Sequence, residues 1–179
     1  MSIRSNAMII LGLLCYVTLF PSNSLAASCS VRTGNINFGT YDPFDPTHLD
    51  VNGRIQVRCT GSGYVDAQLR LNPGSSGSCA TRTMQKPPDT LNYNIFIEST
   101  HSSIFCSPGG WYWHIWGNAP WQFNPTTYGR LFSLQTTASP GTYSDTITAT
   151  LTYTSTVSGD VTFNNENMKQ AHGQIEFGQ

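Results

Sequence analysis

A segment near the end of the chain alternates between two kinds of side chain, and it constrains the fold more than any other feature. It follows a Pro140–Gly141 turn signal and runs from residue 143 to residue 154. One parity holds the apolar residues Tyr143, Ile147, Ala149, Leu151 and Tyr153, and the other holds threonines at 146, 148, 150, 152 and 154. Such alternation predicts a β-strand with one buried and one solvated face. Strands of this kind belong to sheets that are packed on one side only.

Shorter segments of the same kind occur along most of the chain, between turn-forming residues. They predict strands at 28–39, 53–59, 64–71, 91–97, 111–116, 129–134 and 143–154. No segment combines a helical period with capping residues. The sequence therefore predicts an all-β fold, an antiparallel β-sandwich of about six to eight short strands.

The first 26 residues have the three parts of a secretory signal peptide. Arg4 supplies the positive charge, residues 7–20 are uncharged and mostly apolar, and Ser24–Leu25–Ala26 or Leu25–Ala26–Ala27 offers a cleavage site. The apolar run is shorter than the roughly 20 residues of a spanning helix. A retained anchor, or a lipoprotein lipidated at Cys29, is the alternative. We expect an exported protein that keeps no membrane span after signal cleavage.

The composition fits one secreted domain. Charged residues make up 11% of the sequence and the formal net charge is −1, whereas about 25% of a typical soluble protein is charged. Nothing in this balance attracts nucleic acid or an anionic membrane. We place the domain at residues 27–156, between the signal peptide (1–26) and a polar C-terminal tail (157–179).

The cysteines indicate disulfide bonds. Signal cleavage leaves Cys29, Cys59, Cys79 and Cys106. An even number in an exported chain predicts disulfides, and four cysteines allow three pairings. We favour Cys29–Cys59 and Cys79–Cys106, which pair nearest neighbours in the sequence and close loops of about thirty residues. Each bond would stabilise the fold by about 3 kcal/mol, because it lowers the conformational entropy of the unfolded chain. Zinc is the competing interpretation, but no CxxC or HxxxH spacing occurs.

Residues 111–123, WYWHIWGNAPWQF, hold all four tryptophans. The residues that share one parity, and that we expect to face the core, are Trp111, Trp113 and Ile115. The candidates for an exposed adhesive surface are then Tyr112, Trp116 and Trp121. Large aromatic side chains suit such a surface because they stack on sugars and on other flat surfaces.

Polar side chains give little sign of catalysis or metal binding. An acidic group that could bind calcium consists of Asp42, Asp45, His48 and Asp50, but its spacing matches no known calcium loop, and Asp before Pro is a turn device. The histidines are scattered, no serine lies in a G-x-S-x-G sequence, and no carboxylate pair marks a cleft. We expect no enzyme, no metal site and no cofactor.

Seven motifs in order resemble the spore coat protein U family, the subunit domain of archaic chaperone–usher pili. The motifs are CSVRTGNINFGTYDP (29–43), IQVRC (55–59), RTM (82–84), LNYNIFI (91–97), WG (116–117), YGR (128–130) and Gln135 with PGTYSD (140–145). They cover most of the mature chain, from residue 29 to about residue 154.

This resemblance implies an incomplete immunoglobulin-like β-sandwich that lacks its last strand. Such a domain exposes a hydrophobic groove and an unpaired strand edge. Family members fill the groove with a strand from a periplasmic chaperone and later from a neighbouring subunit. The residues expected to border the groove are Tyr143, Ile147, Ala149, Leu151 and Tyr153. The implied protein is a structural or adhesive subunit of a surface pilus (adhesion, biofilm or spore coat), with a chaperone, an outer-membrane usher and other pilus subunits as partners.

Two features depart from the family pattern. Signal cleavage leaves only two or three residues before Cys29, where polymerising members carry a donor extension, so we expect a chain that accepts a strand but donates none from its N-terminus. The second is the tail after Thr156. Its apolar pairs, Val161/Phe163 or Ile175/Phe177, could occupy the groove in this molecule or a neighbour, and a disordered tail is the alternative. The alternative function is a free-standing secreted carbohydrate-binding module.

Overall fold

The structure, a computed structural model, describes residues 26–156 and residues 171–176. Its strands are β1 (Ser28–Thr33), β2 (Leu49–Leu71), β3 (Arg82–Lys86), β4 (Asp89–Phe96), β5 (Trp113–Phe123), β6 (Thr126–Leu131), β7 (Thr148–Thr156) and β8 (Ala171–Glu176), with one 3-10 turn, η1 (Gly74–Ser76). The signal peptide before residue 26 lies outside the described residues, as do Val161, Phe163 and Phe177. None of the described segments is a helix long and apolar enough to cross a membrane.

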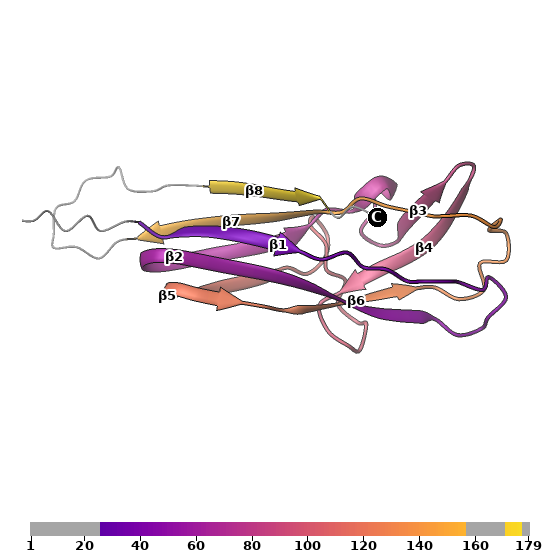
Figure 1. Cartoon of the computed structure of the whole chain (residues 1–179), viewed down its shortest axis with the longest axis horizontal. Helices are drawn as coiled ribbons and strands as arrows, with labels where there is room; N and C mark the ends of the chain where they lie inside the picture. Colours follow the sequence, from indigo (N-terminus) through magenta and orange to yellow (C-terminus); the bar gives the residue numbers. More distant parts are fainter. Residues whose placement is uncertain (1–25, 157–170, 177–179) are drawn as a thin grey trace, which may run out of the picture.

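The long strand β2 organises the sheet. Its residues 49–54 pair with β6, residues 55–60 pair with β1, and residues 64–71 pair with β7, while β5 pairs with it between residues 57 and 69. Every pair of named strands is antiparallel, and the main order is β3-β4-β6-β2-β7-β8. β2 thus joins two halves of the sheet, one with β6, β4 and β3 and the other with β1, β5, β7 and β8 (Figure 1), and the two halves share one core. The predicted all-β antiparallel fold is confirmed.

Apolar side chains from both halves form that core. β2 contributes a buried residue at every second position from Val65 to Leu71, and β7 does the same at Ala149, Leu151 and Tyr153. Leu91, Tyr93 and Ile95 of β4, Phe105 and Leu131 complete the cluster. The threonine face of β7 lies away from the core, as its alternation predicted.

Several predicted elements differ in their bounds. β1 ends at Thr33 rather than at residue 39, β5 spans 113–123 rather than 111–116, β6 spans 126–131 rather than 129–134, and β3 was not predicted. Segments 53–59 and 64–71 form one strand, because a register shift between Cys59 and Gly63 carries β2 through Gly61 and Gly63, which both have positive φ. The last predicted strand begins at Thr148 rather than at residue 143. In the preceding segment, Ser144 makes an isolated bridge to Gln85 of β3, so this part of the chain pairs with the other half of the sheet.

One disulfide joins two strands of the sheet, and the other joins two segments outside the strands. Cys29 of β1 is bonded to Cys59 of β2, and Cys79 is bonded to Cys106. This is the pairing that we favoured from the sequence. The first bond joins residues that are direct partners in the β1–β2 register. The second ties the loop after η1 to the segment that precedes β5.

Candidate functional site

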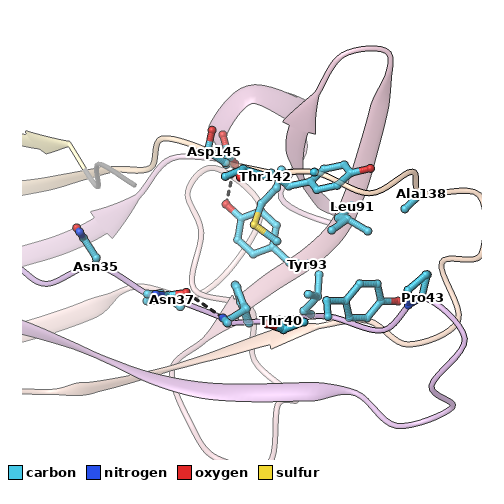
Figure 2. A pocket seen from close by; sticks show the side chains of 18 of the residues that line it. Asn35, Asn37, Thr40, Pro43, Leu91, Tyr93, Ala138, Thr142 and Asp145 are labelled. Atoms are coloured by element: carbon cyan, nitrogen blue, oxygen red, sulfur yellow. Dashed lines mark hydrogen bonds between the residues drawn. The ribbon is translucent and has the colours of Figure 1, made fainter.

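A cavity of about 660 Å³ opens between residues 35–43, which follow β1, and residues 138–147, which precede β7. Residues 35–43 form the first wall and residues 138–147 form the second. Figure 2 shows these two walls, with Leu91 and Tyr93 of β4 between them. The apolar side chains that line the floor are Met84, Leu91, Tyr93, Ile95 and Leu131. The cavity therefore lies where the first and last parts of the domain run past each other over an apolar surface.

Two glycines let the first wall approach the sheet. A Cβ at Gly53 would lie 2.7 Å from Ile36 Cγ1, and a Cβ at Gly129 would lie 3.1 Å from both Ile36 and Phe38. Real Cβ atoms do not come as close as the first of these contacts, so Ile36 needs glycine beneath it. The Phe38 ring in turn makes an edge contact with Tyr93, at a centroid distance of 6.0 Å. Residues 36 and 38 are thus held flat against the inner surface of β2, β4 and β6.

A small hydrogen-bond network holds Tyr41, which lines the cavity. The Tyr41 hydroxyl donates to Phe132 O at 2.9 Å and accepts from Gln135 N at 3.1 Å. The Gln135 side-chain amide bonds both backbone groups of Asn92, accepting from the N–H at 2.6 Å and donating to the carbonyl at 3.0 Å. Gln135 therefore takes the place of a neighbouring strand for β4 at this point.

Asp145 anchors the second wall. Its carboxylate accepts from the Tyr93 hydroxyl at 2.6 Å and from Ser75 N at 2.9 Å, and it also contacts the Ser75 hydroxyl. Burial raises the pKa of Tyr93 well above its usual value, and the bond to Asp145 adds to this effect. Gly74, with a φ of +72°, passes directly beneath this carboxylate, where a side chain would collide with it.

β3 supports the same wall from behind. Gln85 and Ser144 exchange backbone hydrogen bonds of 2.7 and 3.2 Å. β3 is itself held by Arg82, which is fully buried and donates to Asn72 O, Phe105 O and Asn94 Oδ1. Burial lowers the pKa of Arg82 to about 10, so its guanidinium remains charged at neutral pH.

The structure separates the five residues expected to border a groove. Tyr143 and Ile147 line the cavity, whereas Ala149, Leu151 and Tyr153 lie buried on β7. One edge of β7 pairs with β2 and the other pairs with β8. From the sequence we did not assign the first wall or the β4 floor to the site. The FGTYDP and LNYNI motifs, together with Gly53 and Gly129, were the available signals, but they become meaningful only when the segments are brought together.

The aromatic segment is partly exposed. Tyr112 is 39% exposed and Trp116 is 62% exposed, as we expected, but Trp111 is 59% exposed although its parity predicted a core position. Trp111 lies before β5 begins, so strand parity does not apply to it. Trp121, a candidate for the exposed surface, is half-buried and packs against the core. It lies opposite Cys59 in the register of β2 and shares its parity with Trp113.

The acidic group at 42–50 consists of turn and ion-pair contacts. Asp42 accepts from Phe44 N, and Asp45 accepts from Thr47 N, at 2.9 and 2.8 Å. Asp50 binds Arg130 through both oxygens, at 2.7 and 2.6 Å. Within residues 26–156 and 171–176, no three His, Cys, Asp or Glu side chains are grouped so as to hold a metal ion.

Comparison with solved structures supports the immunoglobulin-like fold. One chain of the CsuC–CsuE chaperone–tip adhesion subunit pre-assembly complex, from the archaic chaperone–usher Csu pili of Acinetobacter baumannii, matches with a TM-score of 0.50 and 23% identity. The match covers 70% of this chain but only 39% of that chain, so this protein spans well under half of its length. The expected incomplete immunoglobulin-like sandwich is therefore confirmed at the level of the fold.

A PapD-like domain of human CEP192 also matches, with 12% identity over 96% of this chain and 95% of that one, but its TM-score of 0.34 is too low to support an inference. A search of curated protein sequences found no match. A family model described as the Spore Coat Protein U domain matches residues 16–150. The chain therefore belongs to the spore coat protein U domain family.

Proposed function

We propose that this protein is a structural or adhesive subunit of a chaperone–usher surface pilus, and that it is assembled by accepting a β-strand from a partner. The observation that carries the proposal is the open cavity between residues 35–43 and 138–147. Family membership and the fold support the subunit role. In this role the protein performs no catalysis: its activity is to bind a strand.

The cavity has the properties that strand addition requires. Its floor is apolar and includes Met84, Leu91 and Tyr93, on which the apolar side chains of an extended segment would pack. Its walls are chain segments, so a strand lying between them would find backbone groups on both sides. In β-strand addition, such backbone hydrogen bonds supply affinity and the pockets supply specificity. A buried strand would thus complete the sandwich in a way that the domain alone does not.

The proposed partners are a periplasmic chaperone, an outer-membrane usher and other pilus subunits. The similar structure is, by its description, a complex of a chaperone with a tip adhesion subunit, which supports a chaperone as the first partner. We place the protein in the periplasm during transit and then at the cell surface, with residues 1–26 as the signal peptide, 27–156 as the strand-accepting domain and 157–179 as a tail.

The proposal is tested by co-expressing the chain in a bacterial periplasm with the chaperone encoded nearby, followed by size-exclusion chromatography. We expect a soluble one-to-one complex. Ala138→Arg, which places a charged side chain at the cavity wall, should abolish that complex. Thr136→Arg is the matched control, because Thr136 lies on the same loop, is exposed and does not line this cavity. A chain that elutes alone in the presence of the chaperone, or an Ala138→Arg complex as abundant as the control, would overturn the proposal.

The exposed aromatic residues support a second candidate, a secreted carbohydrate-binding module. The Trp116 ring lies tilted against the His114 ring, with centroids 5.1 Å apart, and His114 is hydrogen-bonded to Asp66 at 2.6 Å. The Arg70 guanidinium lies 4.2 Å above the Tyr112 ring. Aromatic faces beside charged groups are suited to sugar rings. Glycan-array binding that is lost in Trp116→Ala, by a chain that forms no chaperone complex, would favour this candidate over a pilus subunit.

A further inference from the structure

The outer edge of β7 is occupied by the chain's own C-terminal strand. β8 pairs antiparallel with residues 148–153 of β7, which pairs with β2 on its other edge. Figure 1 shows β8, in yellow, lying along β7 with its arrow directed toward the end of the molecule that holds β3. All the other pairs of named strands are antiparallel too, so β8 extends the sheet in the same hydrogen-bonding pattern.

The register matches the two faces of β7. Ile175, Gly173 and Ala171 lie opposite the buried residues Ala149, Leu151 and Tyr153, in that order. The polar residues Glu176, Gln174 and His172 lie opposite Thr148, Thr150 and Thr152. Directly opposite residues in an antiparallel pair lie on the same face of the sheet. A slip of one residue would reverse this match, so the observed register is the one that the β8 sequence favours.

β8 offers few large apolar side chains to the buried face of the sheet. Of its three residues in register with the core face, only Ile175 is a large aliphatic type, and the others are glycine and alanine. Backbone hydrogen bonds are available to any sequence, whereas pocket-filling side chains decide how tightly an added strand is held. A partner's strand with large apolar residues at these three positions would therefore bind the same edge more tightly.

The covered edge and the open cavity are continuous along the chain. β8 ends opposite Thr148, at Glu176. The residue before Thr148 is Ile147, which lines the cavity, and the cavity wall extends from there toward the N-terminus as far as Ala138. A strand long enough to fill the cavity and to run on along β7 would meet β8 at this point. The partner's strand and β8 would therefore meet at Thr148, and they would compete for the edge of β7 from that residue onward.

Chain length permits this arrangement within one molecule. β7 ends at Thr156 and β8 starts at Ala171, whose register partner is Tyr153. The two ends are therefore close, and the fourteen residues between them are far more than such a connection needs. Tethered strands have effective concentrations in the millimolar range. A free strand at micromolar concentration must then bind about 1,000-fold more tightly than β8 to displace half of it.

We propose that β8 is an internal complementing strand, which covers the β7 edge in the free protein and is displaced when a partner's strand enters the cavity and extends along β7. The occupancy of the edge by β8 stands on the strand register, and its displacement rests on the proposed function. The free chain is then protected along residues 148–153 and open only at the cavity end of the groove.

A disulfide lock in the full-length chain tests the first part. Thr152 and His172 are direct register partners on the polar face, and opposite residues lie about 4.5–5.5 Å apart between Cα atoms, within the range of a disulfide. We expect Thr152→Cys/His172→Cys to form a third, intramolecular disulfide in the monomer, detected by mass spectrometry after proteolysis. Either no cross-link, or a cross-link found only between two copies, would overturn β8 as an internal strand.

Hydrogen exchange on the full-length chain independently tests whether β8 pairs with β7. Because β7 has partners on both edges, about half of the amides in residues 148–153 should depend on β8. Ile175→Asp should make those amides exchange at least 10-fold faster, while Gln174→Asp, one residue away on the other face, should leave them protected. Equal protection in the two variants would contradict the inference.

The lock then tests the displacement. With the chaperone co-expressed, the single variants Thr152→Cys and His172→Cys should form the complex, and the locked double variant should form at least 10-fold less of it. A locked chain that binds the chaperone as well as the single variants would refute the competition. If the single variants also fail to bind, the proposed function fails, and the cross-link and exchange results still decide the place of β8.

Discussion

Replacing Arg82 by methionine removes the buried group that holds β3, and through it the second wall of the cavity. The Arg82 side chain is 0% exposed. It donates to Asn72 O at 2.8 Å, to Phe105 O at 2.7 Å and to Asn94 Oδ1 at 2.9 Å. Methionine has a comparable unbranched stem but no donor, so all three acceptors would lose their partner inside the protein.

The magnitude follows from two opposing effects. A buried acceptor left without a partner costs about 1–3 kcal/mol, so three cost about 6 kcal/mol. Methionine avoids the desolvation that lowers the pKa of Arg82 from 12.5 to about 10, which at about 1.4 kcal/mol per pKa unit is worth about 3 kcal/mol. The expected loss is about 3 kcal/mol, which is a large part of the 5–15 kcal/mol of a typical domain. For a domain of this size it lowers Tm by about 10 °C.

Urea unfolding of the mature chain, with both disulfides intact and tryptophan fluorescence as the probe, measures this loss. Arg58→Met is the matched control, because Arg58 lies on the exposed face of β2. Its unfolding free energy should stay within about 0.5 kcal/mol of the parent value. If the Arg82→Met midpoint equals that of the control, the reasoning about the buried guanidinium is refuted.

Three further predictions concern charge, close packing and exposure. The bond from Arg130 lowers the pKa of Asp50, so the stability that this pair adds is present above pH about 4 and is lost as pH falls. Asp50→Asn should lower the unfolding free energy at pH 7 by less than about 1 kcal/mol, and this difference should shrink as the pH falls through the lowered pKa of Asp50; a difference that does not shrink on acidification would contradict this. Gly129→Val should press on the first wall and cost about 1–3 kcal/mol in urea unfolding, and an unchanged midpoint would show that the wall yields freely. Acrylamide should quench the fluorescence of Trp116 but not that of Trp121, and each contribution is obtained by comparing the parent chain with Trp116→Phe or Trp121→Phe. Equal quenching of the two indoles would contradict the difference in their exposure.

Much of the fold could be predicted because it depends on local patterns. The alternation at 146–154 predicts a strand and its buried face whatever its neighbours are. The cysteine count and spacing led to the observed pairing, since Cys29 and Cys59 lie on strands that follow one another and pair directly. The all-β class likewise needed only the period of the apolar residues.

Parity was less informative where a strand began or ended. Trp111 precedes β5 and is exposed, whereas Trp121 lies on the inward parity of a strand that continues seven residues beyond the predicted segment. Where β5 starts and stops is set by its pairing with β2, which is a long-range contact. The sequence pattern alone could not place these two indoles.

The sequence by itself determined the all-β class, most of the strands and the family to which the motifs belong. Only the tertiary structure decided what the motifs build. Phe38, Tyr93 and Asp145 are far apart in the chain and are ordinary residues in their own segments, yet together they form the walls and floor of one cavity. In the same way, residues 171–176 became a partner for β7 only through their register. The physical reason is that a strand's period is local, whereas a groove and a free edge are made by segments that meet only when the sheet closes.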